Sequence, residues 1–148
     1  MQKIFTLGTD LRTPEDFIEI INSYNIEVVV DVRSYPVSKL DHFRRTNLEL
    51  LLKKEMLEYH YSGNELGGFR KSGYENYTHT PEFENGITML ERIASAKISV
   101  IICAERFPWK CHRRFIARAL QGRGWVVEHI IDKGKVWAPK QLRGAVSE

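Results

Sequence analysis

The run IEVVVDV at residues 26–32 is β-branched and apolar almost throughout, and it constrains the fold more than any other segment. A strand of this composition is typical of a parallel sheet that is covered on both faces, because such a strand offers little to water on either side. Parallel neighbours are joined by crossover connections, which place helices on the faces of the sheet. The segment therefore predicts an α/β fold.

Four further runs have the character of strands, and stretches of helical periodicity separate them. The strand-like runs are KIFTLG (3–8), LEYHYS (57–62), KISVIIC (97–103) and WVVEHI (125–130). The helical stretches start after Thr13, cover 47–56, run from Thr80 to about residue 96, and cover 111–123. This order predicts a single three-layer domain over residues 1–148, with a mainly parallel five-stranded sheet and helices on both faces. Residues 138–148 are a candidate for a flexible basic tail.

Residues 63–80, GNELGGFRKSGYENYTHT, have no clear hydrophobic period. Loops longer than about 12 residues inside compact domains are usually functional or disordered. The tyrosines and the paired glycines favour a functional loop. Gly67 and Gly68 are therefore candidates for a segment whose backbone approaches a substrate closely.

Polar side chains follow the predicted strands at the points where they end. Asp31 and Arg33 follow the second strand, residues 65–68 the third, and residues 103–105 the fourth. Ligands of open α/β sheets bind at the carboxyl ends of the strands. We therefore expect Asp31, Glu105 and the segment around Cys111 to surround one concavity.

The segment CAERFPWKCHRR, residues 103–114, contains both cysteines of the chain. Cys111 lies at the predicted start of a helix beside His112 and Arg113, and helix N-termini and neighbouring cations lower a thiol pKa from about 8.5 into the range of about 3.5–7.5. Cys103 ends an apolar strand, where burial favours the neutral thiol. Cys111 is therefore expected to be the more reactive thiol.

Three functional uses of this segment compete with a purely structural role for two buried cysteines. In nucleophilic catalysis, Cys103 and Cys111 would be nucleophile and second thiol in either order, with Glu105 or His112 moving a proton and Arg113 holding an anion. A metal site would need further ligands, because C-x7-C-H lacks the short spacing of common zinc sites. In nucleic-acid binding, Phe107 and Trp109 would stack on bases. Basic side chains of the same segment would contact phosphate: Arg106, Lys110, Arg113 and Arg114.

The DVRSYP motif after the second strand has two interpretations. Asp31 and Arg33 are either a buried structural pair or part of the substrate site, with Asp31 orienting Arg33 toward an anionic group. His60, His79 and His129 each lie in or after a predicted element without a neighbouring motif, which is typical of histidines with an ordinary hydrogen-bonding role.

The charge of the chain is uneven along its 148 residues. Residues 1–102 carry 12 Lys/Arg and 15 Asp/Glu, a net charge of −3, whereas residues 103–148 carry 10 and 4, a net charge of +6. The basic part is either a solvated surface or a site for an anionic partner. No apolar run approaches the roughly 20 residues of a membrane span, and MQKIFTLGTD has no cleavable signal pattern, so we expect a cytoplasmic protein without a membrane partner.

The motifs DVRSYP, ELGG, TPEF, CAERFPWKCHRR and VVEHI together resemble the domain-of-unknown-function 488 family (DUF488). The cysteine segment with its closing Cys-His-Arg is the specific part, and the resemblance covers nearly the whole chain. It implies a compact α/β domain and leaves the activity open. The chain departs from the family after the first strand, where Gly8-Thr9-Asp10 replaces a common Gly-His-Ser type turn. A looser similarity to rhodanese domains, whose loop cysteine carries sulfur, concerns the fold only.

These observations predict an enzyme with a thiol-dependent site that acts on an anionic or nucleotide-like substrate. The predicted catalytic residues are Cys103, Cys111, Glu105 and His112, and the predicted substrate-binding residues are Arg113, Arg33, Asp31, Gly67 and Gly68. No metal and no cofactor are expected, and the oligomeric state stays open. The alternative is a nucleic-acid or nucleotide-binding module with structural cysteines, which would tolerate replacement of either cysteine by serine.

Overall fold

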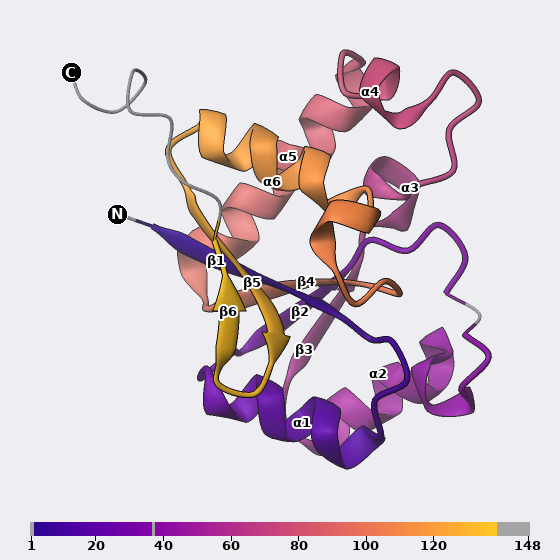
Figure 1. The fold of residues 1–148 in the computed structure, drawn as a ribbon, viewed down its shortest axis with the longest axis vertical. Helices are drawn as coiled ribbons and strands as arrows, with labels where there is room; N and C mark the ends of the chain where they lie inside the picture. The colour runs from indigo at the N-terminus through magenta and orange to yellow at the C-terminus, as the bar shows by residue number, and fades with distance from the viewer. Residues whose placement is uncertain (1, 37, 139–148) are drawn as a thin grey trace.

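A single sheet of six strands forms the centre of the protein, in a computed structural model that describes residues 2–36 and 38–138 (Figure 1). The strand order is β3-β2-β4-β1-β5-β6, and only β6 runs antiparallel to its neighbour. The strands are β1 (Lys3–Gly8), β2 (Val28–Asp31), β3 (Glu58–Tyr61), β4 (Ser99–Cys103), β5 (Val126–Asp132) and β6 (Lys135–Trp137). The predicted α/β fold with a mainly parallel sheet is confirmed.

The count of five strands is wrong by one, because β6 was not predicted. This strand has only three residues, and all three are exposed. It follows β5 through a turn at Lys133 and Gly134, where Gly134 has a φ of 74°. A three-residue exposed strand carries too short a pattern for its period to be recognised.

The helices begin where the sequence supplies caps and prolines. They are α1 (Pro14–Ser23), α2 (Arg45–Lys54), α3 (Gly63–Leu66), α4 (Tyr74–Tyr77), α5 (Pro81–Ala96) and α6 (Arg113–Gly122), with 3-10 turns η1 (Asp41–Phe43) and η2 (Pro108–Lys110). Thr13 and Thr80 accept hydrogen bonds from backbone N–H groups of the first turns of α1 and α5, at 3.1 and 3.3 Å. The short helices α3 and α4 lie in the stretch that showed no period.

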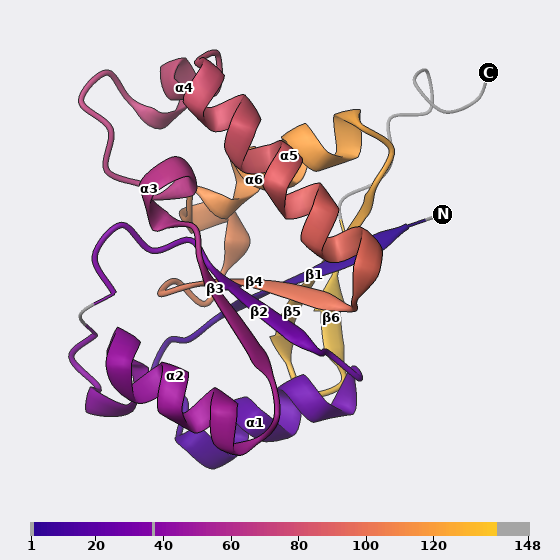
Figure 2. The same ribbon diagram turned by 180° about the vertical axis from the view of Figure 1, so that it is seen from behind.

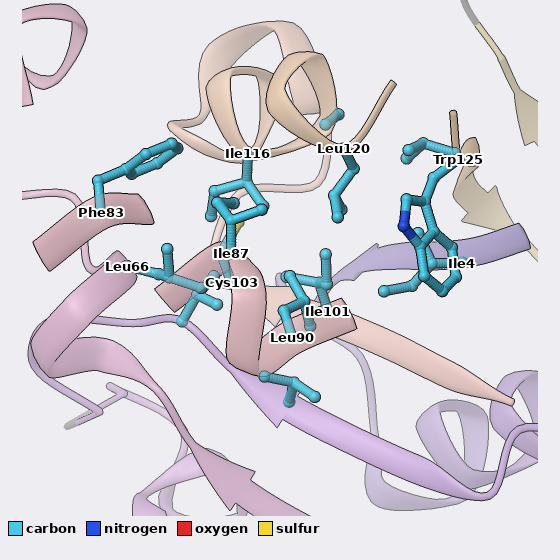
Figure 3. Close-up of a cluster of buried hydrophobic side chains, with 14 of the residues drawn as sticks. Ile4, Leu66, Phe83, Ile87, Leu90, Ile101, Cys103, Ile116, Leu120 and Trp125 are labelled. Carbon is cyan, nitrogen blue, oxygen red and sulfur yellow. The ribbon is translucent and has the colours of Figure 1, made fainter. Parts of the chain in front are cut away.

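Helices cover both faces of the sheet (Figures 1 and 2). The helices α1 and α2 pack on one face, where the buried residues are Phe17, Ile20, Ile21, Phe43, Leu48 and Leu52 together with Val29, Val100 and Ile102 of the strands. The helices α5 and α6 pack on the other, where Phe83, Ile87, Leu90, Ile116 and Leu120 meet Val28, Val30 and Ile101 (Figure 3). Successive residues of one strand alternate between the two cores, which explains the almost continuous apolar run of β2.

The connections create a crevice at the carboxyl end of β4. The chain leaves β1 and β2 toward the face of α1 and α2, whereas it leaves β4 toward the face of α6. Since β4 lies between β1 and β2, neighbouring connections diverge on both sides of it. Ligands of doubly wound sheets bind at such switch points, and the residue that ends β4 is Cys103.

Two expectations concern the ends of the chain and the membrane. The candidate tail at 138–148 falls outside the described residues except for Ala138. Within the described part of the chain, no helix has the length and apolar character needed to cross a membrane.

Candidate active site

A pocket of about 320 Å³ opens at the carboxyl end of β4. Four segments that are far apart in the sequence form its wall: the loop after β2, the segment after α3, the loop after β4, and the residues between η2 and α6. The lining residues are Arg33, Ser34, Tyr35, Gly68, Phe69, Cys103, Ala104, Glu105, Lys110, Cys111 and His112. Glu105 and Cys111 line this pocket, as the strand-end rule predicts, whereas the fully buried Asp31, which was expected beside them, does not.

Cys111 lies directly before α6, which begins two residues later than the sequence predicted. The backbone N–H of Arg113 donates a hydrogen bond to the Cys111 Sγ at 3.4 Å, and His112 Nδ1 lies 3.6 Å from the same sulfur. The side chain is 7% exposed and lines the pocket. Cys111 therefore combines a donor from the first turn of a helix with limited access from the pocket.

The two thiols line the same pocket and differ in acidity. The interaction with Cys103 lowers the pKa of Cys111, with help from His112 and Arg113 and against the effect of burial. Burial raises the pKa of Cys103 well above its ordinary value, and the interaction with Cys111 raises it further, while the Cys103 Sγ donates to the Glu105 carbonyl at 3.9 Å. Of the two cysteines, Cys111 is therefore the one whose surroundings favour a thiolate.

His112 is held in one orientation between the pocket and the core. Its Nε2 lies 3.0 Å from the carbonyl oxygen of Val32, which can only accept, so Nε2 carries a proton. Its ring packs on Tyr74 at a centroid distance of 5.2 Å. On the other side, a Cβ added to Gly68 would lie 2.8 Å from His112 Nδ1. His112 Nδ1 is thereby directed at Cys111, as acceptor of its thiol proton or as donor to its thiolate.

Arg113 is fully buried and forms no ion pair among the described residues. Its guanidinium donates to Thr6 Oγ1 at 2.9 Å, to the Glu105 carbonyl at 2.6 Å and to the Arg106 carbonyl at 3.1 Å, while its Nε finds no hydrogen-bond partner in the part of the chain that the structure describes. It does not line the pocket. The sequence analysis assigned Arg113 to a substrate anion. In the structure it lies behind the pocket wall, where its charge lowers the pKa of both thiols.

Two residues beneath Arg113 form part of its support. Thr6 Oγ1 lies 2.6 Å from His129 Nδ1 and also accepts from Arg113, so the Thr6 hydroxyl donates to a neutral His129. Burial, together with the charge of Arg113, lowers the pKa of His129 to about 4. Thr6 and His129 are opposite each other on β1 and β5. The sequence analysis did not single out Thr6 and gave His129 only an ordinary hydrogen-bonding role, because a polar residue within an apolar strand is the only local signal of such a contact.

Asp31 and Arg33 form a buried pair at the side of the pocket. The Arg33 Nε and one terminal nitrogen donate to the two Asp31 carboxylate oxygens at 2.8 Å each, and the other terminal nitrogen donates to the Phe43 carbonyl at 2.7 Å. Tyr59 also donates to Asp31, at 2.6 Å. Arg33 lines the pocket, whereas the fully buried Asp31 lies behind it. Asp31 therefore holds Arg33 in one orientation, which agrees with both sequence interpretations.

Glycines bring the walls together at two points. A Cβ on Gly8 would lie 1.9 Å from the Glu105 carbonyl oxygen, so only glycine lets the end of β1 support the cysteine loop at this distance. A Cβ on Gly67 would lie 2.2 Å from Ser34 Oγ. Gly67 does not line the pocket itself, and its contribution is to hold the segment before Gly68 against the loop after β2.

The mouth of the pocket carries charged and aromatic side chains. Glu105 and Lys110 are exposed, and neither forms an ion pair within residues 2–36 and 38–138. Tyr35 and Phe69 are 69% and 77% exposed, and their rings lie 5.5 Å apart. The described residues contain no cluster of three or more His, Cys, Asp or Glu side chains that could hold a metal ion.

The sequence model of the family described as "Domain of unknown function DUF488" matches residues 13–120. The chain belongs to the DUF488 family. No curated protein and no solved structure matches it.

The DUF488 match includes the pocket but leaves out part of its support. It contains Arg33, both cysteines and Arg113, whereas Thr6 and His129 lie outside residues 13–120. Strands β1 and β5, which flank the matched segment, thus supply the Thr6 hydroxyl that accepts from Arg113 and the His129 ring that accepts from Thr6.

Proposed function

We propose that this DUF488 protein is an enzyme in which the Cys111 thiolate attacks an anionic small-molecule substrate. The observation that carries the proposal is the buried guanidinium of Arg113, which has no carboxylate partner among the described residues and lies beside both thiols. An isolated charge in a protein interior is costly unless an opposite charge or good hydrogen bonds compensate it. A thiolate at Cys111 provides that opposite charge.

The remaining residues fit definite roles around this nucleophile. His112 exchanges a proton with Cys111 through Nδ1 while its Nε2–H stays on the Val32 carbonyl. Lys110 supplies positive charge on the wall of the pocket for an anionic group, beside Arg33, whose own charge is balanced by Asp31. Glu105 is the exposed proton carrier at the mouth. Cys103 is the second thiol, deeper than Cys111 at 2% exposure.

The alternative, a nucleic-acid-binding module, has less support from the basic residues of this segment. Arg106 is paired with Asp10 at 3.2 Å and Asp132 at 2.9 Å. Arg114 donates to the Trp109 carbonyl at 3.1 Å. The ring of Phe107 stacks on Trp109 at 5.1 Å, so one face of each ring is already occupied, although 48% of Trp109 is exposed. The module also offers no reason for two thiols in one pocket.

The proposal is tested by the pH dependence of alkylation of the folded protein with iodoacetamide. Cys103→Ser retains only Cys111, and its serine still offers a hydroxyl donor; Cys111→Ser retains only Cys103. We expect the Cys103→Ser protein to react with an apparent pKa well below the ordinary value of about 8.5, and the Cys111→Ser protein to react slowly at all neutral pH values. Arg118→Met, which removes an exposed charge from the same helix, is the control that leaves the profile unchanged.

Two outcomes contradict the proposal. One is an apparent pKa at or above about 8.5 for Cys111. The other is the absence of any reaction of Cys111 while circular dichroism shows the variant folded. Either result would identify the cysteines as packing residues.

A further inference from the structure

We propose that Cys111 and Cys103 act as a dithiol pair that reduces small disulfides carrying both an ammonium and a carboxylate group. This inference rests on the proposed thiolate function of Cys111 and names its reaction and substrate class. It draws on the arrangement of the two sulfurs, on the partners of Arg113, and on the charges at the mouth of the pocket.

The two thiols are arranged in depth. Both line the pocket, Cys103 more deeply buried than Cys111, and each lies close enough to change the pKa of the other. A nucleophile that only transfers an acyl or phosphoryl group does not require a second thiol in contact with it. A nucleophile that attacks a disulfide does, because the mixed disulfide is released by attack from a neighbouring thiol.

The reaction balances in two steps. The Cys111 thiolate attacks one sulfur of the substrate disulfide, forming a Cys111–substrate disulfide and expelling the other half as a thiolate. Cys103 then gives its proton to that departing thiolate and attacks the Cys111 Sγ, expelling the second half. Two electrons pass from the cysteine sulfurs to the substrate, which leaves as one thiol and one thiolate that takes its proton from water, and a second small thiol or dithiol must reduce the internal disulfide again.

The surroundings of Cys111 favour the reduced state. The titratable and charged groups that face it are Cys103 from β4, His112 and Arg113 from the start of α6, Tyr74 from α4 and His129 from β5. When the disulfide forms, the buried Arg113 loses the Cys111 thiolate as a neighbouring anion. A dithiol pair whose reduced form is stabilised in this way is a weak reductant with an easily reduced disulfide, so the second thiol, which restores the dithiol, drives the reduction of the substrate.

The mouth of the pocket indicates the substrate class. Glu105 and Lys110 carry opposite charges on the pocket wall, suited to an ammonium and a carboxylate of one molecule. The aromatic pair Tyr35 and Phe69 offers apolar surface for the chain between them. The volume of about 320 Å³ is at the lower end for small-molecule sites, which span about 300–1,000 Å³.

The first test follows the reduced full-length protein with oxidised glutathione by intact mass spectrometry. We expect the unchanged protein to release two equivalents of thiol and to form an internal disulfide. The Cys103→Ser variant should stop at a mixed disulfide on Cys111, and Cys111→Ser should not react. Glu105→Gln and Lys110→Met should each slow the reaction about two- to fivefold, as expected for an exposed ion pair, without slowing the reaction with uncharged bis(2-hydroxyethyl) disulfide.

The second test measures the equilibrium of the unchanged protein with reduced and oxidised glutathione. Because reduction creates a thiolate at Cys111 and consumes two protonated thiols, one proton is released. The equilibrium constant for reduction should therefore rise about tenfold per pH unit between about pH 6 and 8. A constant value over this range would overturn the stabilised reduced state.

The failure of this inference is distinct from the failure of the proposed function. If Cys111 is alkylated at low pH but the unchanged protein accumulates a mixed disulfide without closing to Cys103, the dithiol cycle is wrong and the thiolate proposal stands. Equal slowing of both disulfides in the Glu105 and Lys110 variants would overturn the substrate class. If Cys111 shows no low-pH reactivity, both proposals fall.

Discussion

Replacing Thr6 by valine tests the network under the active site, because the two side chains have nearly the same shape. In the native protein, the Thr6 hydroxyl accepts from Arg113 at 2.9 Å and donates to His129 at 2.6 Å, and all three residues are buried. Valine leaves one guanidinium N–H and the His129 Nδ1 without partners, beside an Arg113 Nε that already has none. Each buried group that loses its partner costs about 1–3 kcal/mol, so the expected loss of stability is about 2–6 kcal/mol.

The assay is equilibrium urea unfolding, with Thr6→Ser as the matched control. Serine keeps the hydroxyl and removes one methyl group, which costs about 1 kcal/mol. Thr6→Val should therefore be less stable than Thr6→Ser by at least about 1 kcal/mol, at an unchanged slope of free energy against urea. If valine is tolerated as well as serine, the network does not hold Arg113, and the buried charge must be compensated in another way.

Two further predictions concern acid stability and the cysteine loop. Burial and the charge of Arg113 lower the pKa of His129 to about 4, whereas an unfolded histidine titrates near 6.5. Between these pH values the unfolded chain binds a proton that the folded protein does not bind. About 3 kcal/mol of folding stability is therefore lost as the pH falls from 6.5 to 4. His129→Gln should flatten this part of the stability curve, and a curve as steep as that of the unchanged protein would refute the assignment. Gly8→Ala places a Cβ 1.9 Å from the Glu105 carbonyl and should reduce both stability and the alkylation rate of Cys111. Gly122→Ala lies in α6 with open space around the added Cβ, so it should leave the alkylation rate unchanged and should not lower stability, since alanine favours a helix more than glycine does.

Much of the fold could be predicted because its signals are local. The apolar run of β2 predicted a covered parallel strand, and Thr-Pro pairs predicted the starts of α1 and α5. The errors occurred where local signals were weak. The exposed β6 has three residues, and the helix predicted from Cys111 begins at Arg113, because Cys111 first closes the η2 turn by donating its N–H to Pro108.

The place of the cysteine segment was also determined by the sequence alone. In a parallel sheet all strands end at the same edge, so the residues that follow β2 and β4 lie along one edge of the sheet. Their direct proximity depends on the strand order, which places β2 beside β4 and pairs Asp31 in register with Ile102, next to Cys103. The nature of the residues at the edge, two thiols with a histidine and arginines, is likewise a property of the sequence.

Only the tertiary structure decided which charge is buried and what supports it. Arg113 and Arg114 are adjacent, yet one is fully buried and the other exposed, because neighbouring residues point about 100° apart around a helix and the start of α6 sets which of them faces the sheet. Thr6 and His129 are 123 residues apart and meet only because β5 pairs with β1. Strand order depends on how whole elements pack, and no local pattern encodes it. This packing places Arg113, which has no carboxylate partner among the described residues, behind the two thiols.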